Sequence, residues 1–89
     1  MIHLVASGRV QGVGYRWFIR EAARRLGLRG WVRNRADGSV EIAASGDTSA
    51  VRSLAETART GPPGAHVTSV VELSTDGIEL LESAFTIQH

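Results

Sequence analysis

Cysteine is absent from this chain of 89 residues. Its absence excludes disulfide bridges, thiolate metal sites and a cysteine nucleophile, so we expect stability to come from packing. The three histidines, His3, His66 and His89, stand far apart and lack the spacing of metal ligands. We therefore expect neither a metal ion nor a cofactor.

Long apolar runs are also missing, and no segment reaches the length needed to cross a bilayer. Residues 1–4 lack the basic start and the extended apolar core of a signal peptide. We expect a cytoplasmic protein with no membrane partner.

Lysine is the third absence, and all ten basic residues are arginines. Eight of them fall within residues 1–44 against three acidic residues, a formal charge of +5, whereas residues 45–89 carry −4. The basic half suits nucleic acid or a small anionic substrate. Because the net charge of only +1 disfavours a large polyanion, we expect no nucleic-acid partner.

A single domain spanning residues 1–89 is expected, since the chain has no repeat, linker or low-complexity tract. Apolar patterns bounded by turn residues predict strands over 2–7, 30–35, 39–44, 67–73 and 85–88. The helical period predicts one helix that begins near Tyr15 and stops at Gly27, and a second that follows Asp47 or Thr48 as cap and stops at Gly61. Residues 78–81 are expected in a loop or a short turn.

Each predicted helix carries one apolar stripe. The stripes consist of Tyr15, Phe18, Ile19, Ala22, Ala23 and Leu26, and of Val51, Leu54, Ala55 and Ala58. Glu21 is expected to pair with Arg25 one turn later. The larger aromatic residues, Trp17, Phe18, Trp31 and Phe85, are expected to pack in the core.

This order of elements predicts an α+β fold of the ferredoxin-like βαββαβ type. It is a sandwich in which two helices pack on one face of an antiparallel sheet. The dipeptide Asp37-Gly38 is a strong hairpin signal between the second and third strands.

The most informative segment, residues 8–16, reads Gly-Arg-Val-Gln-Gly-Val-Gly-Tyr-Arg and joins the first predicted strand to the first helix. Its three glycines permit positive φ and a close backbone approach to a ligand. Successive backbone N–H groups in such a turn form a concave anion site, and the helix adds its positive end. Arg16 lies at that positive end, where a cation is poorly placed unless an anion such as phosphate completes the arrangement. Considered alone, the loop fits a plain strand-to-helix turn equally well.

Several chemistries do not fit this loop. It lacks the Lys-Ser/Thr pair of nucleoside-triphosphate loops, and Trp17 stands where a dinucleotide-binding loop needs its third glycine. No Ser-His-Asp set and no paired carboxylates accompany it. What remains is a phosphate cradle with one arginine and no evident nucleophile or general base.

A second segment, residues 30–41, carries Asn34 near the end of the second predicted strand. Asparagine is disfavoured inside strands, and two interpretations explain it here. Asn34 either starts the turn or places its amide beside the phosphate cradle. In the second case its carbonyl accepts a hydrogen bond from water, and its NH₂ donates one to a phosphate oxygen.

Residues 8–16 and residues 30–41, which read Gly-Trp-Val-Arg-Asn-Arg-Ala-Asp-Gly-Ser-Val-Glu, closely resemble the two signature segments of acylphosphatases. Residues 61–70 resemble the third recurring segment of that family, and residues 85–89 resemble its closing strand. The resemblance covers the whole chain. It implies an α/β sandwich and the hydrolysis of acyl phosphates to a carboxylate and inorganic phosphate, without a metal.

By position, the resemblance makes Arg16 the catalytic residue that grips the phosphoryl group and Asn34 the catalytic residue that positions the attacking water. It assigns substrate binding to the backbone of Gln11, Gly12, Val13, Gly14 and Tyr15. The expected protein is a monomer that binds a small-molecule acyl phosphate, with phosphate or sulfate as a product-like ligand.

Two positions depart from the family pattern. Tyr15 stands where phenylalanine is common, which should be tolerated if its hydroxyl reaches solvent. The ending Gln88-His89 replaces a more usual basic or aromatic ending, and we expect this to affect edge packing and stability rather than chemistry.

An RNA-binding or regulatory module shares the same strand order and is the alternative. It would require aromatic and basic residues on the central strands. The third predicted strand, residues 39–44, contains neither, which counts against this alternative.

Overall fold

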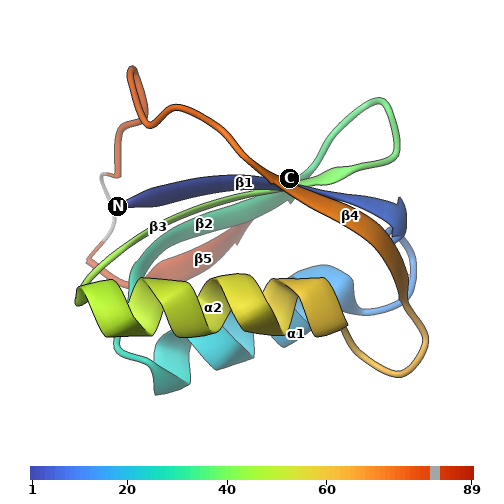
Figure 1. The fold of residues 1–89 in the computed structure, drawn as a ribbon, viewed down its shortest axis with the longest axis horizontal. Coiled ribbons are helices and arrows are strands. Elements are labelled where there is room, and N and C mark those ends of the chain that lie inside the picture. Colours follow the sequence, from blue (N-terminus) through green and yellow to red (C-terminus); the bar gives the residue numbers. More distant parts are fainter. Residues whose placement is uncertain (81–82) are drawn as a thin grey trace.

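The computed structural model describes residues 1–80 and 83–89. In chain order its elements are β1 (Ile2–Arg9), α1 (Tyr15–Arg25), β2 (Arg29–Asn34), β3 (Val40–Ser45), α2 (Thr48–Thr60), β4 (His66–Glu72) and β5 (Phe85–Gln88). The strands form one sheet in the order β4-β1-β3-β2-β5. Both helices lie against the same face of the sheet (Figure 1), so the predicted ferredoxin-like α+β sandwich is confirmed.

One edge of the sheet differs from the prediction, because β5 runs parallel to β2 and makes the sheet mixed. The other three strand pairings are antiparallel, as expected. A short hairpin forces neighbouring strands to run antiparallel. However, β5 reaches its edge through a long connection from β4 at the opposite edge (Figure 1). Its direction is therefore set by the route of that connection.

The core lies between the helices and the sheet. The helical side of it comes from the two predicted stripes, of which Phe18 and Leu26 are only partly buried. The fully buried members are Tyr15, Ile19, Ala22, Ala23, Val51, Leu54, Ala55 and Ala58. Phe85 closes the core from the parallel edge strand, with none of its surface exposed. Trp31 is also buried, so three of the four larger aromatic residues, Phe18, Trp31 and Phe85, pack against other parts of the protein. The fourth, Trp17, is exposed.

One predicted contact at the helix surfaces is wrong, and one predicted cap lies where expected but lacks its side-chain hydrogen bond. Glu21 pairs with Arg20, whose Nε lies 3.2 Å from its carboxylate, instead of with Arg25. Both side chains are partly exposed, and ion pairs near the surface contribute little, so the partner of Glu21 is weakly specified by the sequence. Asp47 occupies the N-cap position of α2, but its side chain makes no capping hydrogen bond.

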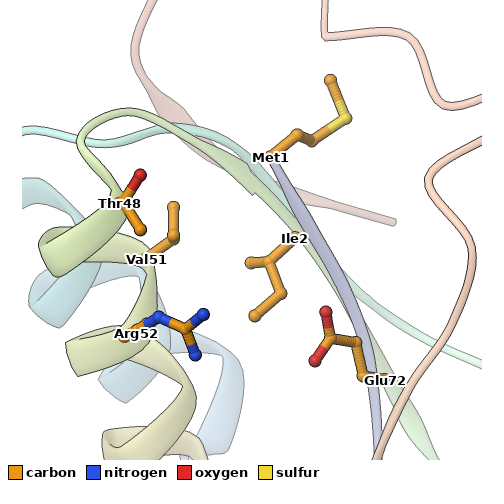
Figure 2. Close-up of a pocket in the computed structure, with 6 residues that line it drawn as sticks. All are labelled: Met1, Ile2, Thr48, Val51, Arg52 and Glu72. Carbon is orange, nitrogen blue, oxygen red and sulfur yellow. The ribbon is translucent and has the colours of Figure 1, made fainter.

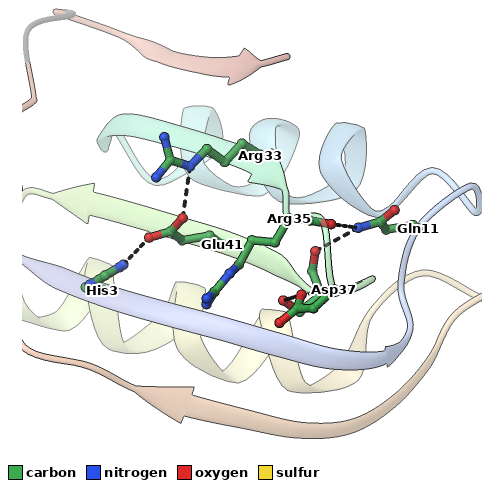
Figure 3. A network of polar contacts seen from close by, with 7 residues as sticks. His3, Gln11, Arg33, Arg35, Asp37 and Glu41 are labelled. Carbon is green, nitrogen blue, oxygen red and sulfur yellow. Dashed lines mark hydrogen bonds and ion pairs between the residues drawn. The ribbon is translucent and has the colours of Figure 1, made fainter.

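The sheet face away from the helices holds a buried polar network (Figure 3). His3 Nε2 lies 2.6 Å from one carboxylate oxygen of Glu41, and Arg33 Nε donates to the other at 2.9 Å. Burial raises the pKa of Glu41, but the hydrogen bonds from His3 and Arg33 outweigh it and hold the pKa below its ordinary value. His3 Nδ1 also lies 2.9 Å from the Ser74 carbonyl oxygen, and the Arg33 guanidinium stacks 4.5 Å above Trp31. The network ties three strands to the segment that follows β4.

Candidate active site

The connection between β1 and α1 is a tight loop whose shape depends on glycine. Gly12 and Gly14 adopt φ of 75° and 80°, a left-handed conformation that other residues rarely take. A Cβ added at either position would meet no atom within 4 Å. Backbone conformation, not crowding, therefore requires glycine here, and the space in front of the loop is open to a ligand.

Gly14 is also the N-cap of α1. It offers no side-chain hydrogen bond to the first turn, and that turn contains no acidic residue. The first N–H groups of an α-helix have no partner within the helix, and the positive end of the helix dipole lies at the same place. The start of α1 is therefore a favourable position for an anion.

A hollow of about 180 Å³ opens beside this loop. It has room for roughly six water molecules. Its walls come from the loop, from α1, from the end of β2 and from the C-terminal residues, namely Val10, Gly12, Gly14, Arg16, Trp17, Asn34, Ile87 and His89. The two residues expected to be catalytic, Arg16 and Asn34, thus share one cavity with two of the loop glycines.

Arg16 extends from the first turn of α1 towards the C-terminus of the chain. Its Nη1 lies 3.5 Å from the Gln88 carbonyl oxygen and 3.4 Å from His89 Nδ1. Both contacts are long and involve a single nitrogen, and a guanidinium has further N–H donors for a ligand. Among the described residues, no acidic side chain forms an ion pair with Arg16. A cation at the positive end of a helix, without an acidic partner, is an electrostatic reason for an anion to bind here.

Asn34 is the last residue of β2 and lies opposite Val40 of β3. Its side chain is exposed and lines the hollow from the side of the sheet. The amide therefore presents a donor and an acceptor to the same cavity as the guanidinium. The sequence left open whether Asn34 only starts the turn or also lies beside the phosphate cradle. Its place in the wall of this hollow favours a position beside the cradle.

Gln11 makes a contact that the sequence analysis missed. Its Nε2 donates to the Arg35 and Ser39 carbonyl oxygens at 2.8 and 2.9 Å, both in the hairpin between β2 and β3 (Figure 3). The hairpin is itself closed by a 2.8 Å hydrogen bond from the Arg35 N–H to the Ser39 carbonyl. Hydrogen bonds from the Ser39 hydroxyl and N–H also lower the pKa of Asp37 in the same turn. Gln11 thus fastens the glycine loop to the hairpin that begins at Asn34.

The side chains of Val13 and Tyr15 point away from the hollow. Val13 faces the turn after α2, where a Cβ added to Gly64 would lie 3.7 Å from its Cβ. Tyr15 is 1% exposed, and its hydroxyl donates to the Ala58 carbonyl oxygen of α2 at 2.8 Å. The hydroxyl therefore does not reach solvent, which was the condition for tolerating tyrosine here, and it finds a buried acceptor instead. Burial raises the pKa of Tyr15.

Four residues of the hollow were not predicted for the site, namely Val10, Trp17, Ile87 and His89. Trp17 was expected in the core but is 58% exposed. The helical period already placed it off the apolar stripe, so a signal was present. His89 was expected to affect packing alone, yet it contacts Arg16. Nothing local in the sequence indicates this contact, because it depends on β5 pairing beside β2.

A second hollow, of about 190 Å³, lies near the opposite end of β1 (Figure 2). It is lined by Met1, Ile2, Thr48, Val51, Arg52 and Glu72. Arg52 and Glu72 extend into it from α2 and β4 with opposite charges. None of the residues expected in the site lines this hollow, and the Glu72 carboxylate would repel a phosphate there.

Within residues 1–80 and 83–89, no three side chains of His, Cys, Asp or Glu are grouped so that they could hold a metal ion. In the same part of the chain, neither helix has the length and apolar character needed to cross a membrane.

The comparisons with known proteins agree with this geometry. A family model described as acylphosphatase matches residues 2–87. The acylphosphatase of Acidiphilium cryptum is 57% identical over 70 residues, 79% of this chain and 77% of that protein. The acylphosphatase of Bifidobacterium longum is 44% identical over 86 residues, 97% of this chain and 89% of that protein.

A solved structure extends the likeness to three dimensions. The crystal structure of acylphosphatase from Bacillus subtilis matches with a TM-score of 0.90 and 38% identity, covering 99% of this chain and 97% of that chain. The family model, the relatives and the shared fold together show that this chain belongs to the acylphosphatase family.

Proposed function

We propose that this protein hydrolyses the carboxyl-phosphate bond of acyl phosphates, releasing a carboxylate and inorganic phosphate. The observation that carries the proposal is that Arg16 of α1 and Asn34 of β2 line one hollow beside the glycine loop. Membership of the acylphosphatase family supports the same reaction.

In this proposal the phosphoryl group lies at the N-terminus of α1. Arg16 binds two phosphate oxygens through its planar guanidinium, and backbone N–H groups of residues 11–15 bind the others. Negative charge on these oxygens must be stabilised as the loose, in-line transition state forms. Because the donors are held by a helix and a tight loop, they need little rearrangement during the reaction.

Asn34 orients the attacking water in this mechanism. Its carbonyl accepts a hydrogen bond from the water, and its NH₂ donates to a phosphate oxygen. The water oxygen attacks phosphorus while the bond to the acyl oxygen breaks, and the electron pair of that bond leaves with the carboxylate. A phosphate oxygen takes the proton of the water. A carboxylate is a good leaving group, so no general acid is required and positioning supplies much of the rate.

The partner in this proposal is a small acyl phosphate, and the protein acts on it as a cytoplasmic monomer without nucleic acid. The RNA-binding alternative would need exposed aromatic residues on the central strands β1 and β3. On the face away from the helices these strands instead carry His3, Val5, Glu41 and Ala43, which are all at least nine-tenths buried. That observation favours the hydrolase.

Phosphate release from acetyl phosphate tests the proposal. We expect turnover by the unmodified protein, a fall in kcat/KM of about 10²–10³ for Arg16→Ala and a fall of about 10² for Asn34→Ala, as for the loss of other preorganised donors. Arg52→Ala is the matched control, since it removes an arginine from the hollow at the far end of β1. Its activity should stay within about twofold.

Circular dichroism and urea unfolding establish that each variant is folded. The proposal fails if the unmodified protein releases phosphate no faster than spontaneous hydrolysis. It fails equally if a folded Arg16→Ala variant keeps the kcat/KM of the Arg52→Ala control.

A further inference from the structure

Trp17 is the one large aromatic side chain that is exposed in the part of the chain that the structure describes. It is 58% exposed, whereas Trp31, Tyr15 and Phe85 are all at least nine-tenths buried. It follows Arg16 directly in the first turn of α1 and lines the same hollow. The large apolar ring of Trp17 therefore stays exposed to solvent, although its burial would stabilise the fold, and it lies at the hollow of the site.

The wall around Trp17 is apolar. Val10 and Ile87 line the hollow with it, opposite in character to Arg16 and Asn34. Phosphate oxygens bind to N–H donors and gain nothing from the ring face of an indole or from aliphatic groups. The apolar part of the hollow therefore suits a different part of the ligand, one made of carbon.

We propose that Trp17 and Ile87 form a subsite for the acyl group and that Trp17 makes the enzyme prefer aromatic acyl phosphates over acetyl phosphate. This inference rests on the proposed function. An in-line reaction requires the acyl group and the water to lie on opposite sides of phosphorus. Two separate elements of the chain serve these two groups: Asn34 on β2 orients the water, and Trp17 on α1 contacts the acyl group.

Single exposed apolar residues are common on protein surfaces and by themselves need no explanation. Met1, Val71 and Leu73 are the other large apolar residues exposed among those the structure describes. None of these three lines the hollow at Arg16, whereas Trp17 does. An aromatic ring beside the reacting group gives a flat surface on which an aroyl ring can stack, and such a pair adds to the free energy of burial.

The test compares kcat/KM for benzoyl phosphate and for acetyl phosphate in the unmodified protein and in Trp17→Ala. We expect the variant to lose about tenfold with benzoyl phosphate, the size of one aromatic contact, and less than about twofold with acetyl phosphate. Trp17→Phe keeps a ring and should keep most of the preference. Trp31→Phe changes a buried tryptophan on the other face of the sheet and should leave the ratio between the two substrates unchanged.

Fluorescence gives a second measurement that does not depend on turnover. The chain has two tryptophans, and only Trp17 lines the hollow. Benzylphosphonate, whose carbon-phosphorus bond is not hydrolysed, should therefore change the emission of the unmodified protein much more than methylphosphonate does. The change should vanish in Trp17→Phe.

The outcomes separate this inference from the proposed function. If the unmodified protein hydrolyses both substrates and Trp17→Ala leaves the ratio of their kcat/KM values unchanged, the acyl subsite is refuted and the hydrolase stands. An undiminished benzylphosphonate response in Trp17→Phe would also refute the subsite. If neither substrate is hydrolysed, the proposed function fails and this inference falls with it.

Discussion

Tyr15 offers the sharpest prediction about stability, because its hydroxyl completes the end of a neighbouring helix. It donates to the Ala58 carbonyl oxygen in the last turn of α2. A regular helix would fill that acceptor with the N–H of residue 62, but residue 62 is Pro62, which has none. Tyr15→Phe therefore leaves a buried carbonyl without its donor, at a cost of about 1–3 kcal/mol in the free energy of unfolding.

Urea unfolding at pH 7 measures this loss. The fold and the position of Arg16 should survive, since the ring of phenylalanine fills the same space. We therefore expect kcat on acetyl phosphate to change by less than about threefold. A variant as stable as the unmodified protein would show that water or a backbone shift satisfies Ala58, and the reasoning would be refuted.

The same residue predicts an unusual dependence of stability on alkaline pH. Burial raises the pKa of Tyr15 in the folded protein above its ordinary value of 10.0. Its stabilising effect is therefore complete below pH 10 and is lost as pH rises above it, because the unfolded chain ionises first. The loss should approach about 1.4 kcal/mol per pH unit.

This chain allows a clean measurement of that loss. It has no lysine, no cysteine and no second tyrosine, so Tyr15 is the one side chain expected to titrate between about pH 9 and pH 12. Urea unfolding across this range should show a fall for the unmodified protein and a nearly flat line for Tyr15→Phe. Parallel falls in the two proteins would contradict the assignment.

Three further predictions concern the site and the sheet. Gln11→Ala removes both hydrogen bonds to the hairpin and should lower kcat/KM about tenfold while costing at most about 2 kcal/mol of stability; equal activity would show that the loop holds its place without them. Glu41→Gln should destabilise the protein by about 1–3 kcal/mol at pH 7. Because the pKa of Glu41 is lowered in the fold, its contribution is present above its ordinary value of 4.5 and is lost as pH falls below it, so urea unfolding should show the difference between the two proteins shrinking there; a constant difference would contradict this. Activity on acetyl phosphate should persist in excess EDTA, since Arg16 and backbone N–H groups supply the charge stabilisation in the proposed mechanism; its loss would refute that part.

Most of the secondary structure was predictable because its signals are local. The helical period placed the start of α1 at Tyr15, and the stripe of α2 was correct at all four positions. The Asp37-Gly38 hairpin fixed the pairing of β2 with β3, and with it the register that puts Asn34 at a strand end. These features depend on residues a few positions apart, which a sequence pattern can record.

The parts that were missed depend on contacts between distant segments. The parallel direction of β5 follows from the path of the chain after β4, and His89 meets Arg16 only because β5 lies beside β2. The hydroxyl of Tyr15 likewise found its acceptor in another helix. For Trp17 the error had a different origin, because aromatic character was given more weight than its position off the apolar stripe.

The central claim is that Arg16 binds the phosphoryl group while Asn34 orients the water, and the binding of inorganic phosphate separates these two roles. Phosphate binding to the unmodified protein, to Asn34→Ala and to Arg16→Ala can be measured by isothermal titration calorimetry, beside turnover of acetyl phosphate. We predict that Asn34→Ala binds phosphate within about threefold of the unmodified protein although its turnover falls about 10², and that Arg16→Ala loses both. Tight phosphate binding by a folded Arg16→Ala variant would contradict the account.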